Sequence, residues 1–135
     1  MADWEVIEEG KVTGATVGDI TFSAIPQTYQ HLEFTFSWRI ENTNYTNVYI
    51  NINGDTGSSY GRCGWASTQA ASHVPFRRTA YEGTGGNGMV GYAAGSNYST
   101  GAFSALNVII PNYTDTDDYT VILSRGAQGG EDYTD

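Results

Sequence analysis

The chain has 135 residues, a length typical of one domain with a single hydrophobic core. Six basic residues stand against fifteen acidic ones, giving a formal net charge of −9. This charge excludes the clustered positive surface that phosphate-based nucleic-acid binding requires. No apolar run approaches the roughly 20 residues of a membrane helix, and no signal peptide is visible. We therefore expect a protein made in a cytosol, without nucleic-acid binding or membrane insertion.

Glycine, tyrosine and small polar residues shape the composition. The chain has 17 glycines and ten tyrosines, against two methionines. This mixture favours short β-strands joined by many turns over helices. Cys63 is the single cysteine, which excludes an intrachain disulfide and a thiolate metal cluster. We predict neither a cofactor nor a metal site.

The N-terminal part combines an acidic arm with two apolar patches. Residues 1–10 mix Trp4 with acidic side chains, and we predict an arm or an edge strand there. The patches at 12–17 and 20–25 are separated by a Gly-Asp pair, which suits a tight hairpin turn. Proline has no N–H for a strand ladder, so the second patch is expected to end as a strand before Pro26.

The strongest structural signal is an alternation between residues 31 and 40. Large apolar and polar side chains occupy alternate positions there, which is the period of a strand with one buried face. Each fully buried large side chain contributes about 1.5–3 kcal/mol, so this face needs a second sheet to cover it. The apolar positions are Leu32, Phe34, Phe36, Trp38 and Ile40.

Turn residues bound the later predicted strands. The segment 48–53 alternates with its even-numbered positions inward, and the Asn53-Gly54 pair at its end is a strong turn signal. Between 68 and 88 no clean period appears. The tail at 126–135 has little to bury, and we predict it to be mobile or held by a partner. Further strands are predicted at 60–67, 89–95, 103–111 and 119–125.

Together these segments predict an all-β fold, an antiparallel β-sandwich of the jelly-roll kind with about seven to nine strands. The short strands and the turns between them recur about every ten residues, which is the spacing of such folds. The sandwich domain is placed at 11–125, between the arm at 1–10 and the tail at 126–135.

Three motifs resemble a family of small proteins encoded in tailed-bacteriophage genomes. The first is the Ile-Pro-Gln-Thr-Tyr-x-His-Leu corner at 25–32, which leads into a strand ending in Arg39. The second is the Asn-Gly-Asp-x-Gly-x-x-Tyr loop at 53–60, and the third is Ile-Pro-Asn-Tyr at 110–113. The order and spacing of the three motifs make the likeness specific.

The resemblance is close over 20–60 and looser over 103–125, and it implies a non-enzymatic virion structural protein. Such a protein is a capsid decoration or cement protein, or a tail or fibre component. A homotrimer is implied, in contact with other virion proteins such as the major capsid protein or tail proteins, after synthesis in the host cytoplasm. Relatives continue with further strands past Asp135, which we expect here to be absent, replaced or supplied by a neighbouring subunit.

The corner residues themselves suit a structural role. Proline fixes φ, Gln and Thr side chains bond loop backbone, and a tyrosine packs its ring while its hydroxyl finds a partner. We interpret His31 as an oriented hydrogen-bonding residue, with catalysis as the open alternative. By the alternation, Arg39 lies on the same outward face as His31, and it is expected to reach the carboxylate of Asp55 or an acid of a partner. The predicted structural corner comprises Pro26, Gln27, Thr28, Tyr29, His31, Arg39, Asn53, Gly54 and Asp55.

Enzymatic chemistry is not predicted. A nucleophilic triad needs a nucleophile, a base and an orienting acid. The chain has two histidines, His31 and His73, and no Gly-x-Ser-x-Gly elbow. A hydrolase with one of these histidines beside a carboxylate stays as a minor alternative. The acids around Asp55 and Asp115 are interpreted as solvated turns, with loose cation binding as their alternative.

Exposed tyrosines among Asn, Ser and Gly residues are typical of a binding surface. They suit stacking on sugars and subunit interfaces equally well. The alternative function is therefore a carbohydrate-binding β-sandwich module that recognises a host-surface glycan. The N-terminal arm and the C-terminal tail are the expected inter-subunit segments. Candidate interface or glycan-stacking residues are Trp4, Tyr60, Trp65 and Tyr98.

Overall fold

The computed structural model of the chain describes residues 4–10, 18–41, 46–55, 60–67, 73–78, 88–96, 103–117 and 119–128. Within these ranges it is all-β and antiparallel, with no helix, as predicted. The strands are β1 (His31–Trp38), β2 (Thr46–Ile50), β3 (Arg62–Ser67), β4 (His73–Arg78), β5 (Gly88–Ala93), β6 (Ser104–Pro111) and β7 (Leu123–Gln128).

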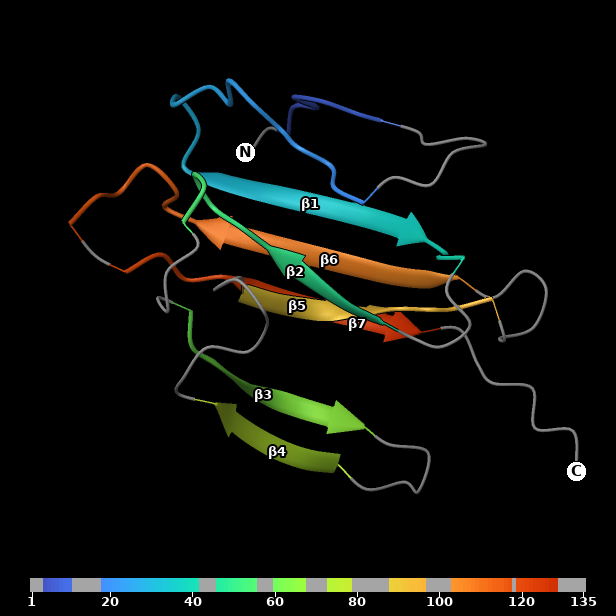
Figure 1. The fold of residues 1–135 in the computed structure, drawn as a ribbon. Helices are drawn as coiled ribbons and strands as arrows, with labels where there is room; N and C mark the ends of the chain where they lie inside the picture. The colour runs from blue at the N-terminus through green and yellow to red at the C-terminus, as the bar shows by residue number, and fades with distance from the viewer. Residues whose placement is uncertain are drawn as a thin grey trace, which may run out of the picture.

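A three-stranded sheet holds the largest part of the core, with β6 between β1 and β7 (Figure 1). β1 and β6 pair antiparallel along their whole lengths, from His31 opposite Pro111 to Trp38 opposite Ser104. β7 pairs with the other edge of β6. β1 therefore pairs with a strand, β6, that lies in the C-terminal third of the chain.

The predicted alternation on β1 is confirmed. Leu32 is 7% exposed, and the apolar positions after it on this strand are half-buried, while the positions between them are exposed. β6 follows the same rule from its buried Ser104 to Ile110, with Val108 only 1% exposed. Cross-strand partners share a face, so these two rows form one apolar surface, called here the inner face.

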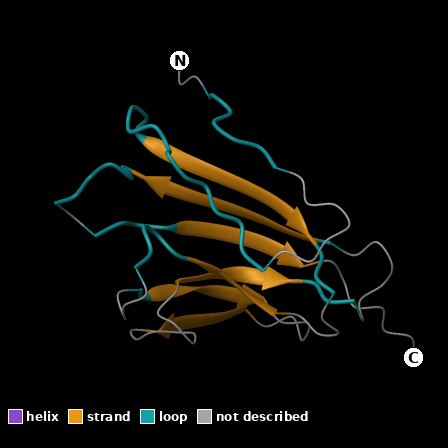
Figure 2. Ribbon diagram, turned by 45° about the horizontal axis from the view of Figure 1, so that its top comes forward, coloured by secondary structure: helices purple, strands orange, loops and turns teal. Residues whose placement is uncertain are grey.

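A second pair of strands, β2 and β5, lies over the inner face (Figure 2). Val48, Ile50 and Val90 of this pair pack against the core of the three-stranded sheet. The contact is close where Gly91 meets β6, because a Cβ at Gly91 would lie 3.0 Å from Leu106 Cδ1. The predicted inward phase of residues 48, 50 and 52 is confirmed, although β2 itself ends at Ile50.

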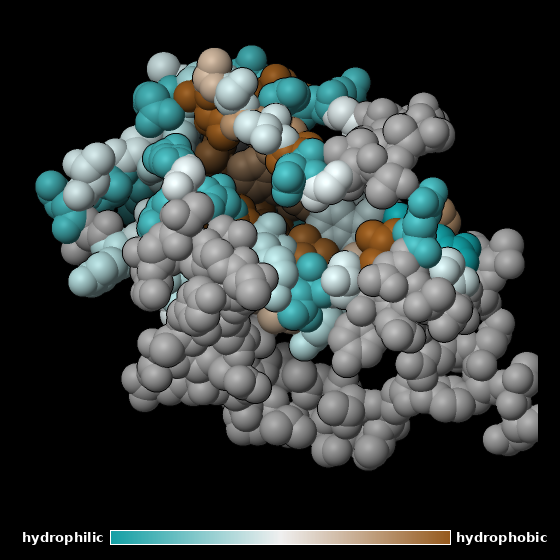
Figure 3. All heavy atoms as spheres, viewed as in Figure 1, coloured by the Kyte–Doolittle hydropathy of each residue, from teal (hydrophilic) through white to brown (hydrophobic). Residues whose placement is uncertain are grey.

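The inner face of β1 carries a row of aromatic rings that the second layer leaves half-buried. Phe34 and Phe36 stack with ring centroids 6.2 Å apart, and Phe36 stacks on Trp38 at 5.1 Å. Phe22, from the segment before the corner, packs on the row with its ring centroid 5.4 Å from that of Phe34. Figure 3 shows apolar side chains reaching the surface in the upper part of that view.

β3 and β4 form a separate two-stranded sheet. β3 falls in the predicted segment 60–67, whereas β4 lies where the sequence shows no clean period. Pro75 lies near the centre of β4 and has no N–H to donate to a strand ladder, so sequence propensity argues against a strand there. The strand is nevertheless present, and Pro75 pairs opposite Trp65 of β3. Cys63 of β3 is exposed.

Two predicted strands are placed differently in the structure. Residues 20–25 form no strand, because Ala24 has a φ of 55° and turns the chain before Pro26. The predicted strand 119–125 begins only at Leu123 and runs through Gln128, three residues into the predicted tail. The patch at 12–17 and the remainder of the tail, 129–135, lie outside the described residues.

Candidate functional site

The corner at 25–32 meets the turn that follows β6. The backbone N–H of Asn112 donates a hydrogen bond to Nδ1 of His31 at 3.2 Å. The hydroxyl of Tyr113 donates to the carbonyl oxygen of Pro26. Two segments about 80 residues apart in the sequence are thus joined by two side chains, and both belong to the motifs that carry the family resemblance.

Local backbone geometry holds each half of this junction. Asn112 has a φ of 48°, a conformation that asparagine adopts more readily than most residues, and its carbonyl accepts from the N–H of Asp115 at 2.9 Å. In the corner, Nε2 of Gln27 donates to the carbonyl of Ile25 at 2.9 Å. Because Nδ1 of His31 accepts the hydrogen bond from Asn112, the neutral ring carries its proton on Nε2.

Tyr29 connects the corner to the N-terminal arm. Its hydroxyl donates a hydrogen bond to Oε2 of Glu5. This bond, followed by burial and by the negative charge of Glu5, raises the pKa of Tyr29 above its ordinary value of 10.0. Residues 4–10 have no regular secondary structure. Within the described part of the chain, the hydrogen bond from Tyr29 to Glu5 is therefore the contact that positions the arm beside the corner.

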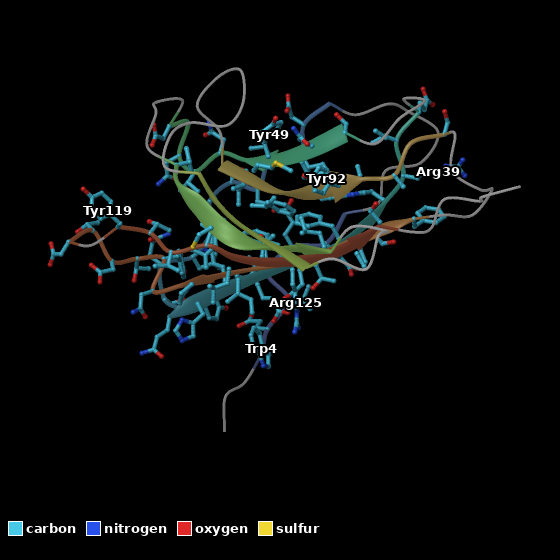
Figure 4. The ribbon with its side chains drawn as sticks, turned by 90° about the horizontal axis from the view of Figure 1, so that it is seen from below. Trp4, Arg39, Tyr49, Tyr92, Tyr119 and Arg125 are labelled. Atoms are coloured by element: carbon cyan, nitrogen blue, oxygen red, sulfur yellow. The ribbon has the colours of Figure 1, made fainter. Side chains whose placement is uncertain are left out.

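The arm exposes its large apolar side chains. Trp4 is 72% exposed and Val6 77%, whereas Ile7 is 43% exposed. Glu5 bonds to Tyr29, whereas the residues on either side of it are exposed. Trp4 lies on the side of the three-stranded sheet opposite to β2 and β5 (Figure 4).

The loop after β2 is a tight turn of the type expected for Asn-Gly. Asn53 and Gly54 have φ values of 52° and 71°, and the N–H of Asp55 donates to the carbonyl of Ile52 at 2.9 Å. Two positive φ values at the central positions define a type I′ turn. The hydroxyl of Tyr60 accepts from the N–H of Ile52 at 3.0 Å, so this tyrosine belongs to the framework of the loop.

Asp55 lies at the centre of further loop bonds. Nδ2 of Asn51 donates to its carbonyl oxygen at 2.7 Å, and the hydroxyl of Tyr60 reaches the same oxygen at 3.5 Å. A Cβ at Gly88 would lie 2.8 Å from Cδ1 of Tyr60, so the ring is packed against the start of β5. These contacts secure the 53–60 motif to both strands of the second layer.

Arg39 and Ile40 anchor the end of β1 to the segment after β5. Nη2 of Arg39 donates to the carbonyl oxygen of Ser96 at 3.1 Å. The N–H of Ile40 donates to the carbonyl of Ala94 at 3.0 Å. The predicted contact of Arg39 with Asp55 or a partner's acid stays a prediction beside this observed bond.

The outward surface of β2 and β5 presents two tyrosines. Tyr49 is 40% exposed and Tyr92 is 44% exposed, and both lie on the upper layer in Figure 4. Nδ2 of Asn47, directly opposite Tyr92, donates to the hydroxyl of Tyr49 at 2.9 Å. Neither strand contains a charged residue. This set, Asn47, Tyr49 and Tyr92, is called here the tyrosine face.

The outer surface of the three-stranded sheet has a different character. Nδ2 of Asn107 donates to Oε1 of Glu33 and, at 3.3 Å, to the hydroxyl of Thr35. Arg125 lies opposite Asn107 in the register, and Leu123, which is 55% exposed, precedes it on the same face. Trp4 and Arg125 lie on the same side of this sheet (Figure 4).

The remaining candidate residues are placed as follows. Thr28 is exposed in the corner, and Trp65 belongs to β3, but its side chain lies outside the described part of the structure. Tyr98, Asp118 and the side chain of His73 are also outside it. Tyr49 and Tyr92 are among the tyrosines that the sequence places on polar phases, but that they share one face follows from the pairing of Asn47 with Tyr92, which the local pattern does not predict.

The described ranges contain no group of three or more His, Cys, Asp or Glu side chains placed to hold a metal ion. The carboxylate of Asp115 instead accepts the N–H of Asp117 at 2.9 Å. They also include no helix with the length and apolar character needed to cross a membrane.

Comparison of the chain with family models, curated proteins and solved structures finds no significant match.

Proposed function

We propose that the chain is a non-enzymatic structural component of a tailed-phage virion, folded as a jelly-roll-like β-sandwich. It decorates or cements the capsid, or forms part of a tail or fibre. The observation that carries this proposal is the bond from Asn112 to His31. It brings together two of the motifs on which the family resemblance rests, and its role is to hold two loops in a fixed geometry.

Exposed apolar side chains support a protein that works by association. Isolated soluble domains rarely expose contiguous apolar patches. Here Trp4, Val6 and Leu123 are each more than half exposed. Symmetric copies of such a subunit would combine weak contacts into a strong attachment. The expected partners are further copies of the chain, as a homotrimer, and the major capsid or tail proteins of a virion assembled in the host cytoplasm.

The test is to locate the protein in intact particles. Phage particles purified from a lysate should contain the chain at a stoichiometry fixed by particle symmetry, and its density should occupy repeated positions on the head or tail. Deletion of residues 1–10 should remove it from the particle while the truncated chain stays folded. Absence of the chain from purified particles would refute the proposal.

The tyrosine face favours a second candidate function, binding of a neutral host-surface glycan. Tyr49 and Tyr92 offer aromatic rings for stacking. The hydroxyl of Tyr49 accepts from Asn47, so its own proton and the Oδ1 atom of Asn47 remain to bond sugar hydroxyls. The lack of charge on both strands suits an uncharged ligand.

A panel of neutral oligosaccharides tests this second function by saturation-transfer NMR. Tyr49→Ala and Tyr92→Ala should each abolish transfer to a ligand that the unmodified protein binds. The matched control is Tyr119→Ala, because Tyr119 is 98% exposed and lies away from this face (Figure 4). Equal loss with all three variants, or no transfer to any sugar, would remove glycan binding from consideration.

A further inference from the structure

We propose that the N-terminal arm of one copy binds the outer surface of β7 on a second copy, with Trp4, Val6 and Glu8 of the arm contacting the surface around Leu123 and Arg125. This inference rests on the proposed role as an assembling virion subunit, and it names the contact that role requires.

The arm presents a defined set of side chains to a partner. Glu5 is held by Tyr29 of its own subunit, and the side chains on either side of it, Trp4 and Val6, are exposed. Trp4 and Val6 are 72% and 77% exposed, far more than Ile7 at 43%. Glu8 lies two residues beyond Val6 and is exposed. The arm therefore offers two exposed apolar groups followed by a carboxylate.

The outer surface of β7 offers a matching set. Leu123 is 55% exposed and pairs opposite Ile109 of β6, so these two residues form an apolar pair on the outer surface. Arg125, two residues further on the same face, is exposed. Within the described ranges no acidic side chain forms an ion pair with Arg125, and its cross-strand neighbour Asn107 is bonded to Glu33 and Thr35.

Charge complementarity selects a copy of the arm as the occupant of this surface. Arg125 is an exposed basic residue in a chain that has six basic and fifteen acidic residues. The arm combines exposed apolar side chains with Glu8 and Glu9, which are both exposed. An acid docked against Arg125 would sit at the rim of a contact whose centre is apolar, as in ordinary protein interfaces.

The positions of the two surfaces call for a second copy. The arm is tethered next to the corner that leads into β1, and β7 is at the opposite edge of the sheet, with β6 between them. Both face the same side of that sheet (Figure 4). Each subunit can thus donate one arm and receive another, in a ring such as a trimer or in a reciprocal pair.

The experiment measures self-association of the full chain by size-exclusion chromatography with light scattering across a range of concentrations. The unmodified protein should have a mass of at least two copies of the 14.6 kDa chain. Trp4→Ala should weaken association by about 30-fold or more, which is typical of truncating an interface hot-spot tryptophan. Tyr119→Ala removes an even more exposed aromatic away from the contact and should leave the mass unchanged.

A charge reversal identifies the receiving surface. Arg125→Glu should weaken association, and combining it with Glu8→Arg should restore it. The matched control combines Arg125→Glu with Glu9→Arg, which has the same net charge but places the new arginine one residue further along the arm. Equal rescue by the two double variants would overturn the proposed register, and a monomeric unmodified protein would overturn the contact itself.

These outcomes are separable from those of the proposed function. A chain that is present in purified particles but monomeric in solution at about 100 µM, a concentration at which micromolar contacts form, refutes the arm contact and leaves the virion role standing. An oligomer that shows the Glu8–Arg125 rescue but is absent from particles keeps the contact and refutes the virion role.

Discussion

The hydroxyl oxygen of Ser104 accepts a hydrogen bond from the backbone N–H of Ala94 at 2.8 Å, and both residues are 0% exposed. Ala94 in turn accepts from the N–H of Ile40 through its carbonyl. One buried serine therefore connects the start of β6 with the end of β5, and through Ala94 with the residue pair after β1.

Ser104→Ala should lower the free energy of unfolding by about 1–3 kcal/mol, because it leaves the buried N–H of Ala94 without an acceptor. Urea unfolding followed by tryptophan fluorescence measures the change. Ser37→Ala is the control, since Ser37 is exposed on β1 and should change stability by less than about 0.5 kcal/mol. Equal effects of the two variants would contradict the buried role of Ser104.

The hydroxyl of Tyr29 should titrate at a higher pH than an ordinary tyrosine. Its pKa is raised by the bond to Glu5, so the folded state holds this proton more tightly than the unfolded state. The contribution to stability is present below the unfolded pKa of 10.0 and is lost as the pH rises through the folded pKa. The arm should therefore detach from the corner in strongly alkaline solution.

Absorbance titration of the phenolate bands tests this shift. Tyr29→Phe should remove the late-titrating component, and Glu5→Gln should lower its pKa toward the ordinary value, because the amide can accept the bond but has no charge. Tyr119→Phe, at an exposed position far from Glu5 in the sequence, should leave the late-titrating component in place. A late component that persists in Tyr29→Phe would assign it to another tyrosine.

Gly88→Ala should destabilise the protein by about 1–3 kcal/mol, because the new methyl group would lie 2.8 Å from the ring of Tyr60. The ring has little freedom to withdraw, since its hydroxyl is bonded to the N–H of Ile52. Thermal unfolding measures the loss. Gly18→Ala is the matched control, because nothing lies within 4 Å of its added Cβ.

A double-mutant cycle identifies the cause of that loss. In a Tyr60→Ala background the ring is gone, so Gly88→Ala should cost much less than it does alone. An equal loss of stability in both backgrounds would show that the added methyl group clashes with a group other than the ring of Tyr60.

Gly54→Val should destabilise the loop by at least about 1–2 kcal/mol, because Gly54 has a φ of 71° and a β-branched residue is strained there. Asn53→Gly should be far milder, since glycine adopts the φ of 52° at that position freely. Chemical denaturation of both variants measures the difference. Similar stabilities would contradict the type I′ geometry of this turn.

The sequence predicts those parts of the fold in which local pattern and tertiary packing agree. The alternation from Leu32 to Trp38 placed the inner face of β1 correctly, since a period of two leaves one choice of buried side. The Asn53-Gly54 turn follows as directly, because few residues accept two successive positive φ values.

Prediction was wrong where pairing overrides local preference. The apolar patch at 20–25 has the composition of a strand, yet the positive φ of Ala24 breaks it. β7 includes Gly126 and Gln128, which have little strand propensity, and pairing with Leu106 and Ser104 of β6 accounts for its extension. β4 has a proline in its centre and is likewise found only through its partner strand.

The candidate surfaces depend on contacts between residues that are far apart in the sequence, and composition and local pattern do not predict such contacts. His31 and Asn112 were each noticed in a motif, but their contact follows from the register that places His31 opposite Pro111. Tyr49 and Tyr92 share a face because Asn47, two residues before Tyr49, pairs with Tyr92. Trp4, in contrast, is predicted as a candidate contact from its place in the N-terminal arm, and it stays a prediction.

The pairing of β1 with β6 has a consequence for synthesis on the ribosome. About 70 residues separate the two strands, which corresponds to roughly 4–14 s at ordinary translation rates of about 5–20 residues per second. During that interval the aromatic row of Phe34, Phe36 and Trp38 has emerged before its hydrogen-bonding partner strand exists. Newly made chains should therefore depend on chaperone protection, and slower translation should increase their aggregation.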